Sequence, residues 1–237
     1  MTGDLRATLE RLARPGAEPN AAFDRLVADY AAFHLVLSVL ALVLAVAAGV
    51  GVVAAWRCRR SATAATGRRW TFERATWSMA ILAGVGVCLA ALLLVAANLS
   101  NALDPVPGLR GSIPLVADHA PGSDRERTDV AFDRWLRSGE RRLSPEVRSA
   151  VDRRLAWQRP KAIVCTLLLI VVLLAGRWLW RSVLARARRP DHRWGMASLA
   201  RLAGALAAIV IGSLLVLMVM GNVQASSAPV SMTLFFG

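Results

Sequence analysis

Four long apolar runs dominate the pattern of hydrophobic and polar positions along the chain. They cover Leu35–Trp56, Met79–Ala97, Ala162–Trp180 and Leu202–Gly221. A helix needs about 20 apolar residues to cross the hydrocarbon core of a bilayer. Each run is close to that length, and polar stretches separate the runs. The pattern therefore predicts an all-α integral membrane protein with four transmembrane helices and short amphipathic extracytoplasmic helices.

The charges between the runs predict how the chain is oriented. Segments 57–76 and 181–201 are rich in arginine and tryptophan, and their only acidic residues are Glu73 and Asp191. Short loops with an arginine excess stay in the cytoplasm, and tryptophan is enriched where helices meet the membrane surface. We therefore expect both segments to be cytoplasmic. The N-terminus, the C-terminus and the mixed-charge segment 98–161 are expected outside the plasma (cytoplasmic) membrane.

These signals divide the chain into five segments. Each hairpin consists of two apolar runs and the Arg/Trp-rich loop between them. The predicted segments are amphipathic helices over 1–34, a first hairpin over 35–97, an extracytoplasmic helical loop over 98–161, a second hairpin over 162–221 and an uncharged tail over 222–237.

The two hairpins also align with each other at an offset of 124 residues. Without a gap, this offset aligns five pairs of identical residues of types that are uncommon in apolar helices. The pairs are Trp56 with Trp180, Arg69 with Arg193, Trp70 with Trp194, Asn98 with Asn222, and Pro105 with Pro229. Self-similarity at a fixed offset is the signature of an internal repeat. The sequence thus predicts two tandem parallel two-helix repeats, and these ten residues are candidate structural or functional positions.

Helix start and stop signals lie in the N-terminal segment. Leu5, Leu9 and Leu12 recur at helical spacing, and Pro15-Gly16 ends that pattern. Asn20 is suited to cap a second helix that runs into the first apolar run.

The long loop carries similar signals. Ser123 with Glu126 forms a capping box, and Ser138-Gly139 ends the helix that follows. Ser144 with Pro145 begins another helix. We expect the segment from Asp104 to Gly108 to be irregular, Pro160 to open the third span, and a polar turn to follow Gly221. These outer helices are too few, on this view, for a domain with a sizeable core. They are expected to pack on one another and on the membrane surface, and the apolar tail to dock back on the bundle or the interface.

Small and amide side chains provide further candidates in the spans. Gly204, Ala208 and Gly212 lie four residues apart and predict a helix-packing face, because small residues let helix backbones approach closely in lipid. Asn98 and Asn222 lie at the expected outer ends of their spans. Two interpretations are open for this pair: each caps its helix, or the two share a polar contact across a pseudo-two-fold axis.

Composition excludes two broad classes of protein. The 237 residues are 56% hydrophobic, and the mean hydropathy is +0.46. A soluble globule has fewer apolar residues, and a disordered chain far fewer. The net charge of +13 lies beside apolar spans, so we expect anionic lipid headgroups at the Arg loops as its partner, and no nucleic acid. The alanine- and arginine-rich composition is typical of bacteria. Cys58, Cys88 and Cys165 do not form a disulfide pattern.

No catalytic, nucleotide-binding or metal-binding motif is present in the sequence, and no cofactor is expected. The main hypothesis is a non-catalytic scaffold or accessory subunit of the cell envelope, with a membrane protein or a second copy as partner. The alternative is a small transporter or channel formed by an oligomer, which requires a cavity lined by polar residues of the spans: Ser38, Ser78, Thr166, Ser213, Asn98 or Asn222. An extracytoplasmic enzyme would have to gather Asp104, Asp118, His119 and His34 in one cleft.

Overall fold

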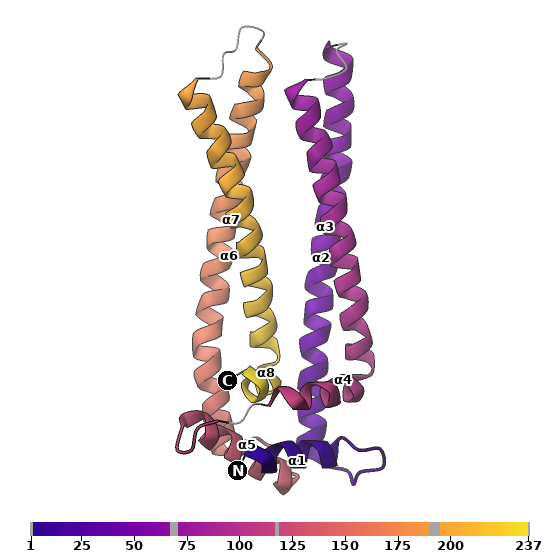
Figure 1. Ribbon diagram of the computed structural model, residues 1–237, viewed down its shortest axis with the longest axis vertical. Coiled ribbons are helices and arrows are strands. Elements are labelled where there is room, and N and C mark those ends of the chain that lie inside the picture. Colours follow the sequence, from indigo (N-terminus) through magenta and orange to yellow (C-terminus); the bar gives the residue numbers. More distant parts are fainter. Residues whose placement is uncertain (1, 67–70, 117–118, 190–194, 237) are drawn as a thin grey trace. The chain divides into compact units, whose positions relative to one another are not determined.

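The computed structural model describes residues 2–66, 71–116, 119–189 and 195–236. Its regular elements, all helical within those ranges, are α1 (Thr2–Leu12), α2 (Ala21–Thr66), α3 (Phe72–Leu103), α4 (Pro105–Ser112), the 3₁₀ helix η1 (Ile113–Leu115), α5 (Asp124–Ser138), α6 (Pro145–Ala187), α7 (Met196–Ser227) and α8 (Pro229–Phe236) (Figure 1). The all-α prediction is confirmed.

Four of these helices, α2, α3, α6 and α7, are long and apolar enough to cross a membrane. The chain is therefore a multi-pass membrane protein, as the hydropathy pattern predicted. Both α2 and α6 are much longer than their apolar runs, because the amphipathic segment before each run joins it without a break. The expectation that Pro160 opens a new helix is wrong, since Pro160 lies inside α6. Strongly helical sequence on both sides tolerates the loss of one backbone hydrogen bond there.

The chain folds as two compact units. One, which we call the extramembrane unit, combines Met1–Ser38, Ala96–Lys161 and Gly221–Gly237; the other, the membrane unit, combines Val39–Val95 and Ala162–Met220. Each of the four long helices runs from one unit into the other. The five segments predicted from the sequence therefore do not coincide with the two units, because the ends of the predicted spans belong to the extramembrane unit.

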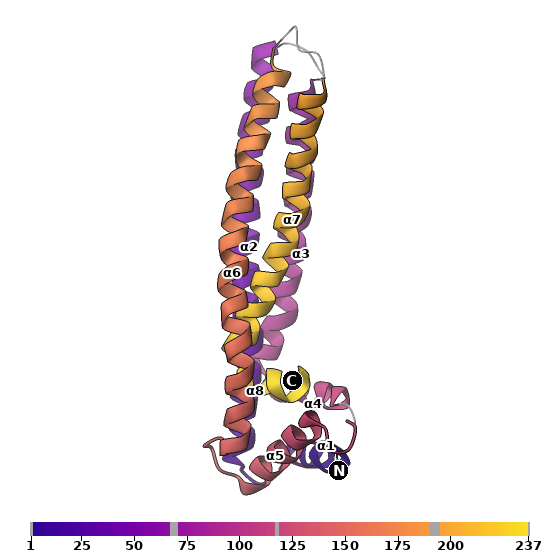
Figure 2. The same cartoon turned by 90° about the vertical axis from the view of Figure 1, so that its left-hand side faces the viewer.

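The extramembrane unit has its own hydrophobic core. Helices α1 and α5 pack side by side (Figures 1 and 2). Fully buried side chains come from six helices and η1, namely Leu5, Leu9, Leu26, Leu109, Ile113, Phe132, Trp135, Leu136, Val147 and Leu234. The expectation that the outer helices are too few to form such a core is wrong. It omitted α4 and α8, which contribute Leu109, Val230 and Leu234 to this core.

Local capping signals in the extramembrane unit are confirmed. The backbone N–H of Phe23 donates to Oδ1 of Asn20 across 2.8 Å, and that of Glu126 donates to Oγ of Ser123 across 3.1 Å. The N–H of Val147 donates to Oγ of Ser144. Gly139 ends α5 with φ 68°, a left-handed conformation that favours glycine. These contacts satisfy backbone groups that helix ends leave unpaired.

Two expectations about the chain beyond the spans are wrong. The segment from Asp104 to Gly108 is not irregular, because α4 begins at Pro105, and proline suits the first position of a helix. Burial of Leu109 in the core favours this helix. No polar turn follows Gly221, because α7 continues to Ser227 and α8 then follows. The tail docks by inserting Val230 and Leu234 of α8 into the core of the extramembrane unit.

Candidate functional site

The two tryptophans that the predicted repeat aligns, Trp56 and Trp180, lie in different surroundings. Trp56 of α2 is exposed, and the guanidinium groups of Arg59 and Arg60 lie 5.7 and 5.3 Å from its ring centroid. Trp180 of α6 is half-buried and lines a cavity of the membrane unit. Arg69, Trp70, Arg193 and Trp194, the other predicted positions of the two loops, lie outside the described residues. Pro105 and Pro229 are the first residues of α4 and α8.

Neither Asn98 nor Asn222 caps a helix. Asn98 lies inside α3, which continues to Leu103, and Asn222 lies inside α7, which continues to Ser227. The capping interpretation is therefore wrong, because both helices continue for about five residues past the asparagines. Asn98 instead accepts a hydrogen bond at Oδ1 from Nδ1 of His34, across 2.7 Å.

The His34–Asn98 pair is buried in the extramembrane unit. The rings of Tyr30 and Phe33 contact the His34 ring edge-on, with centroids 4.5 and 5.1 Å away. The hydroxyl of Ser38 donates to the His34 carbonyl. Nε2 of His34 has no hydrogen-bond partner among the described residues. The pair joins the start of the first span to the end of the second and is a structural contact within one hairpin.

The small residues of α7 lie against α6. A Cβ built on Gly204 would be 3.3 Å from Cδ1 of Leu179, and one built on Gly212 would be 3.7 Å from Cγ1 of Val172. Between them, Cβ of Ala208 would be 3.0 Å from a Cβ built on Gly176 of α6. Gly204, Ala208 and Gly212 thus form the face along which α7 approaches α6, the geometry that small residues allow in lipid.

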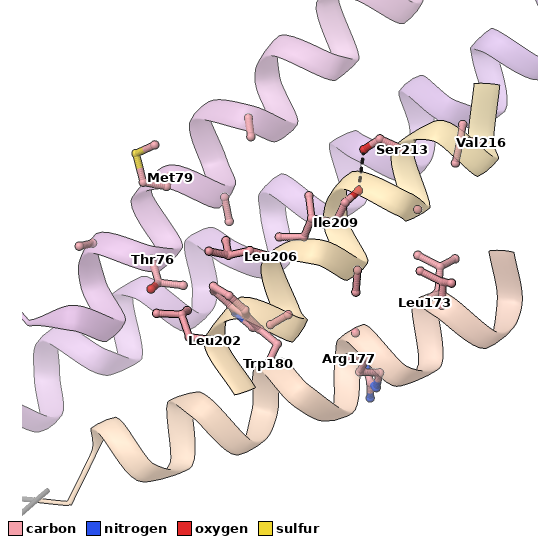
Figure 3. Close-up of a pocket in the computed structure, with 18 of the residues that line it drawn as sticks. Thr76, Met79, Leu173, Arg177, Trp180, Leu202, Leu206, Ile209, Ser213 and Val216 are labelled. Carbon is pink, nitrogen blue, oxygen red and sulfur yellow. Dashed lines mark hydrogen bonds between the residues drawn. The ribbon is translucent and has the colours of Figure 1, made fainter. Parts of the chain in front are cut away.

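The largest cavity described in the membrane unit lies among α3, α6 and α7 and has a volume of about 910 Å³ (Figure 3). Its wall is mainly alanine, leucine, glycine and valine, with Thr76, Ser213 and Arg177 as polar members. Trp180 of α6 extends toward Leu202 and Leu206 of α7 (Figure 3). The cavity therefore has an apolar wall and one cationic side chain.

An ion pair that the sequence did not indicate connects the two hairpins of the membrane unit. Nε of Arg188, just after α6, donates to Oε2 of Glu73 in α3 across 3.0 Å, and Nη2 of Arg188 donates to Oε1 across 2.5 Å. Nε1 of Trp77 also donates to Oε1 of Glu73. A bidentate guanidinium–carboxylate pair is directional as well as attractive. The one sequence signal was that Glu73 is the only acidic residue in its arginine-rich loop.

The hydroxyl groups of the spans are bonded within their own helices. Those of Ser38, Ser78, Thr166 and Ser213 each donate to the carbonyl four residues earlier. Of the six residues expected to line a polar pathway, only Ser213 is among those that line the large cavity. A hydroxyl that is already donating to its own backbone is a weaker ligand for a solute or an ion.

Two residues that the enzyme alternative requires, His34 and His119, bind different partners. His34 pairs with Asn98, whereas Nδ1 of His119 donates to Oδ2 of Asp129 across 2.8 Å. Asp118 lies outside the described residues. No group of three metal-binding side chains occurs within the part of the chain that the structure describes.

The His119–Asp129 pair belongs instead to a network that holds α8. Nη1 of Arg125 donates to the Thr233 carbonyl across 2.6 Å, and Nη2 donates to the Leu234 carbonyl. Nε of Arg125 lies 3.6 Å from Oδ1 of Asp129, which is almost fully buried. Burial raises the pKa of Asp129 above its usual value, against the lowering effects of Arg125 and His119. Asp29 of α2 also binds α8, because it accepts from the backbone N–H and the hydroxyl of Ser231.

Comparison with known proteins identifies no family for this chain. The chain matches no protein-family model, no curated protein and no solved structure.

Proposed function

We propose that the protein is a non-catalytic scaffold or accessory subunit of the cell envelope, which holds a folded extramembrane unit at the membrane for a partner protein. One observation carries this proposal: the extramembrane unit is built on the ends of all four long helices. Its core closes only when residues far apart in the chain, such as Leu5, Leu136 and Leu234, come together. A unit whose own core holds together segments from three parts of the chain suits a docking platform.

The surface offered to a partner is rich in arginine. The turn between α5 and α6 and the first turns of α6 surround a depression of about 690 Å³ that Arg142, Arg148 and Arg153 line together with Glu140 and Asp152. The three arginines are exposed. Exposed guanidinium groups form directional bonds to carboxylates. We therefore favour an acidic segment of a membrane or envelope protein as the partner.

We also propose that the two hairpins are repeats of one two-helix unit. Helices α3 and α7 have 32 residues each, α4 and α8 have 8 each, and the first residues of both pairs are 124 positions apart. Close helix contacts also correspond at this offset. Gly84 meets Val52 in the first hairpin, and Ala208 meets Gly176 in the second. These correspondences support two parallel repeats.

The experiment that tests the scaffold function is a gentle purification of the tagged protein from its native membrane, followed by mass spectrometry of the proteins that accompany it. We expect a stoichiometric protein partner whose recovery falls several-fold in the double variant Arg148→Glu/Arg153→Glu. The control Arg14→Glu reverses an exposed arginine elsewhere on the same unit. A lone oligomer that passes solutes in liposomes would overturn the scaffold proposal and support the transporter or channel alternative.

The proposed orientation, with both termini outside the plasma membrane, has a separate test. Cys58 lies within the first Arg/Trp-rich segment, 57–76, and is exposed, whereas Cys165 is buried. A membrane-impermeant thiol reagent should label Cys58 only after the cells are permeabilised. A cysteine introduced in place of Ala17 of the extramembrane unit should be labelled in intact cells. The reverse pattern would contradict the orientation.

A further inference from the structure

The large cavity of the membrane unit exists because its wall is built from small side chains. Ala80 and Ala83 of α3 and Gly212 of α7 leave space beside the longer side chains of Leu206 and Ile209. Atoms that line a gap among apolar groups lose the dispersion contacts that close packing would give them. Inside a bilayer, hydrocarbon is the available material that fills such a gap without leaving a polar group unpaired. The wall therefore fits an acyl chain.

One charged group lines the same cavity. Arg177 lies on α6 about one turn before Trp180, and its side chain is exposed. Within the described residues, the structure gives the Arg177 guanidinium no hydrogen bond or ion pair. Charged side chains in membrane segments pair with other groups or extend to the headgroup region. A guanidinium group beside an apolar cavity favours a ligand that has an anionic head and an apolar tail.

We propose that this cavity binds one anionic phospholipid, with its acyl chains along Ala80, Ala83 and Gly212 and its phosphate at Arg177. This site gives the lipid a defined place among α3, α6 and α7, beyond a general attraction of the arginine-rich loops to the membrane surface.

The distribution of charge favours a lipid over a second copy of the chain. The helix ends nearest the cavity carry an excess of arginine, which includes Arg74, Arg181 and Arg201. Glu73 is the one acidic residue that the structure describes there, and Arg188 already binds it at both carboxylate oxygens. A second copy would therefore bring like charge to the cavity, whereas an anionic lipid would bring the opposite charge.

Native mass spectrometry of the full-length protein in detergent tests the proposal. The probes are a phosphatidylglycerol, a phosphatidylcholine with the same acyl chains, and inorganic phosphate. We expect one tightly held phosphatidylglycerol, with phosphatidylcholine held more weakly and phosphate not held at all. Arg177→Gln should weaken phosphatidylglycerol binding about fivefold, the effect of one basic group near an anionic lipid surface. Ala83→Leu fills the cavity and should displace both lipids.

Two control variants separate this site from general effects of charge and bulk. Arg57→Gln removes an arginine and Ala54→Leu adds a side chain, both at exposed positions of α2 that do not line the cavity. Both should bind lipid like the unaltered protein. Ala83→Val, a smaller addition, provides a second cavity variant if Ala83→Leu does not fold.

Several results would overturn the proposal. Equal retention of the two lipids would remove the role of Arg177, and unchanged binding in both Ala83 variants would remove the cavity. Retention of free phosphate as strong as that of phosphatidylglycerol would identify an anion site without an acyl chain. A copurifying protein that both Ala83 variants release would instead assign the cavity to a partner helix. None of these results bears on the surface formed by Arg148 and Arg153.

Discussion

The two units of this protein place the same residue types in opposite ways. In the extramembrane unit, Leu136 is fully buried and Trp135 is 2% exposed, whereas Leu93 in the membrane unit is 72% exposed. Water drives the first arrangement, because burying apolar surface there lowers the free energy. Hydrocarbon gives no such drive, and helices in lipid associate through close packing and polar contacts. The difference shows that leucine content identifies the spans, whereas glycine and alanine positions determine how the spans pack.

The largest effect should follow from one truncation made in both units. Leu136→Ala removes a fully buried side chain from the extramembrane core and should lower the free energy of unfolding by about 2–5 kcal/mol. Leu93→Ala makes the same chemical change on an exposed face and should stay within about 0.5 kcal/mol. Urea unfolding of detergent-solubilised protein, followed by tryptophan fluorescence, gives both values. Equal losses in the two variants would contradict the assignment of solvent to each unit.

The next effect concerns close packing within each hairpin. A Cβ on Gly84 would lie 2.7 Å from Cγ2 of Val52, so Gly84→Ala overpacks the contact between α2 and α3. We expect a loss of about 1–3 kcal/mol, most of which Val52→Ala in the same chain should restore. The measurement is the thermal unfolding of single and double variants in detergent.

The second hairpin offers the matched pair. Gly176→Ala would place a Cβ 3.0 Å from Cβ of Ala208, and Ala208→Gly should relieve it. If the hairpins are repeats, the two rescues should be similar in size. Rescue in one hairpin and none in the other would weaken the repeat proposal.

The sequence predicted features that depend on local pattern. The four spans follow from hydropathy, and the caps at Asn20, Ser123 and Gly139 follow from residue types that satisfy a nearby backbone group. The errors occurred where the surrounding sequence or contacts with distant residues outweigh a single local signal. Pro160 was expected to start a helix, but the amphipathic segment before it continues into the span as one helix, α6.

The candidate site shows the same limit. The face of Gly204, Ala208 and Gly212 was visible as a spacing in one helix. The cavity beside it requires three helices at once, and so its position was not predictable from the spacing alone. The Glu73–Arg188 pair and the His34–Asn98 pair each join positions far apart in the chain. Polar partners of this kind are determined by tertiary packing and leave no periodic signal.

A smaller effect is expected at a cap that serves two helices of the extramembrane unit. Oδ1 of Asn20 accepts from the Phe23 N–H at the start of α2, and its Nδ2 donates to the Leu136 carbonyl near the end of α5. Asn20→Ala should lower the free energy of unfolding by about 1 kcal/mol, the usual cost of a lost N-cap. Ser123→Ala, which removes a cap of one helix only, is the control and should cost less. A larger loss in Ser123→Ala would show that the second bond of Asn20 contributes nothing.

The smallest effect is a pH dependence of the extramembrane unit. Burial raises the pKa of Asp129 above its ordinary value of 3.8, so the folded protein holds this proton more tightly than the unfolded chain does. The stabilising contribution of this group is therefore complete below that value and is lost as the pH rises through the raised pKa. An asparagine side chain does not titrate, so Asp129→Asn should gain stability relative to the unaltered protein between about pH 4 and pH 7, by less than about 1 kcal/mol. Thermal unfolding of both proteins across this range tests the sign. A difference that shrinks as the pH rises would mean that the attractions of Arg125 and His119 outweigh the cost of burying the carboxylate.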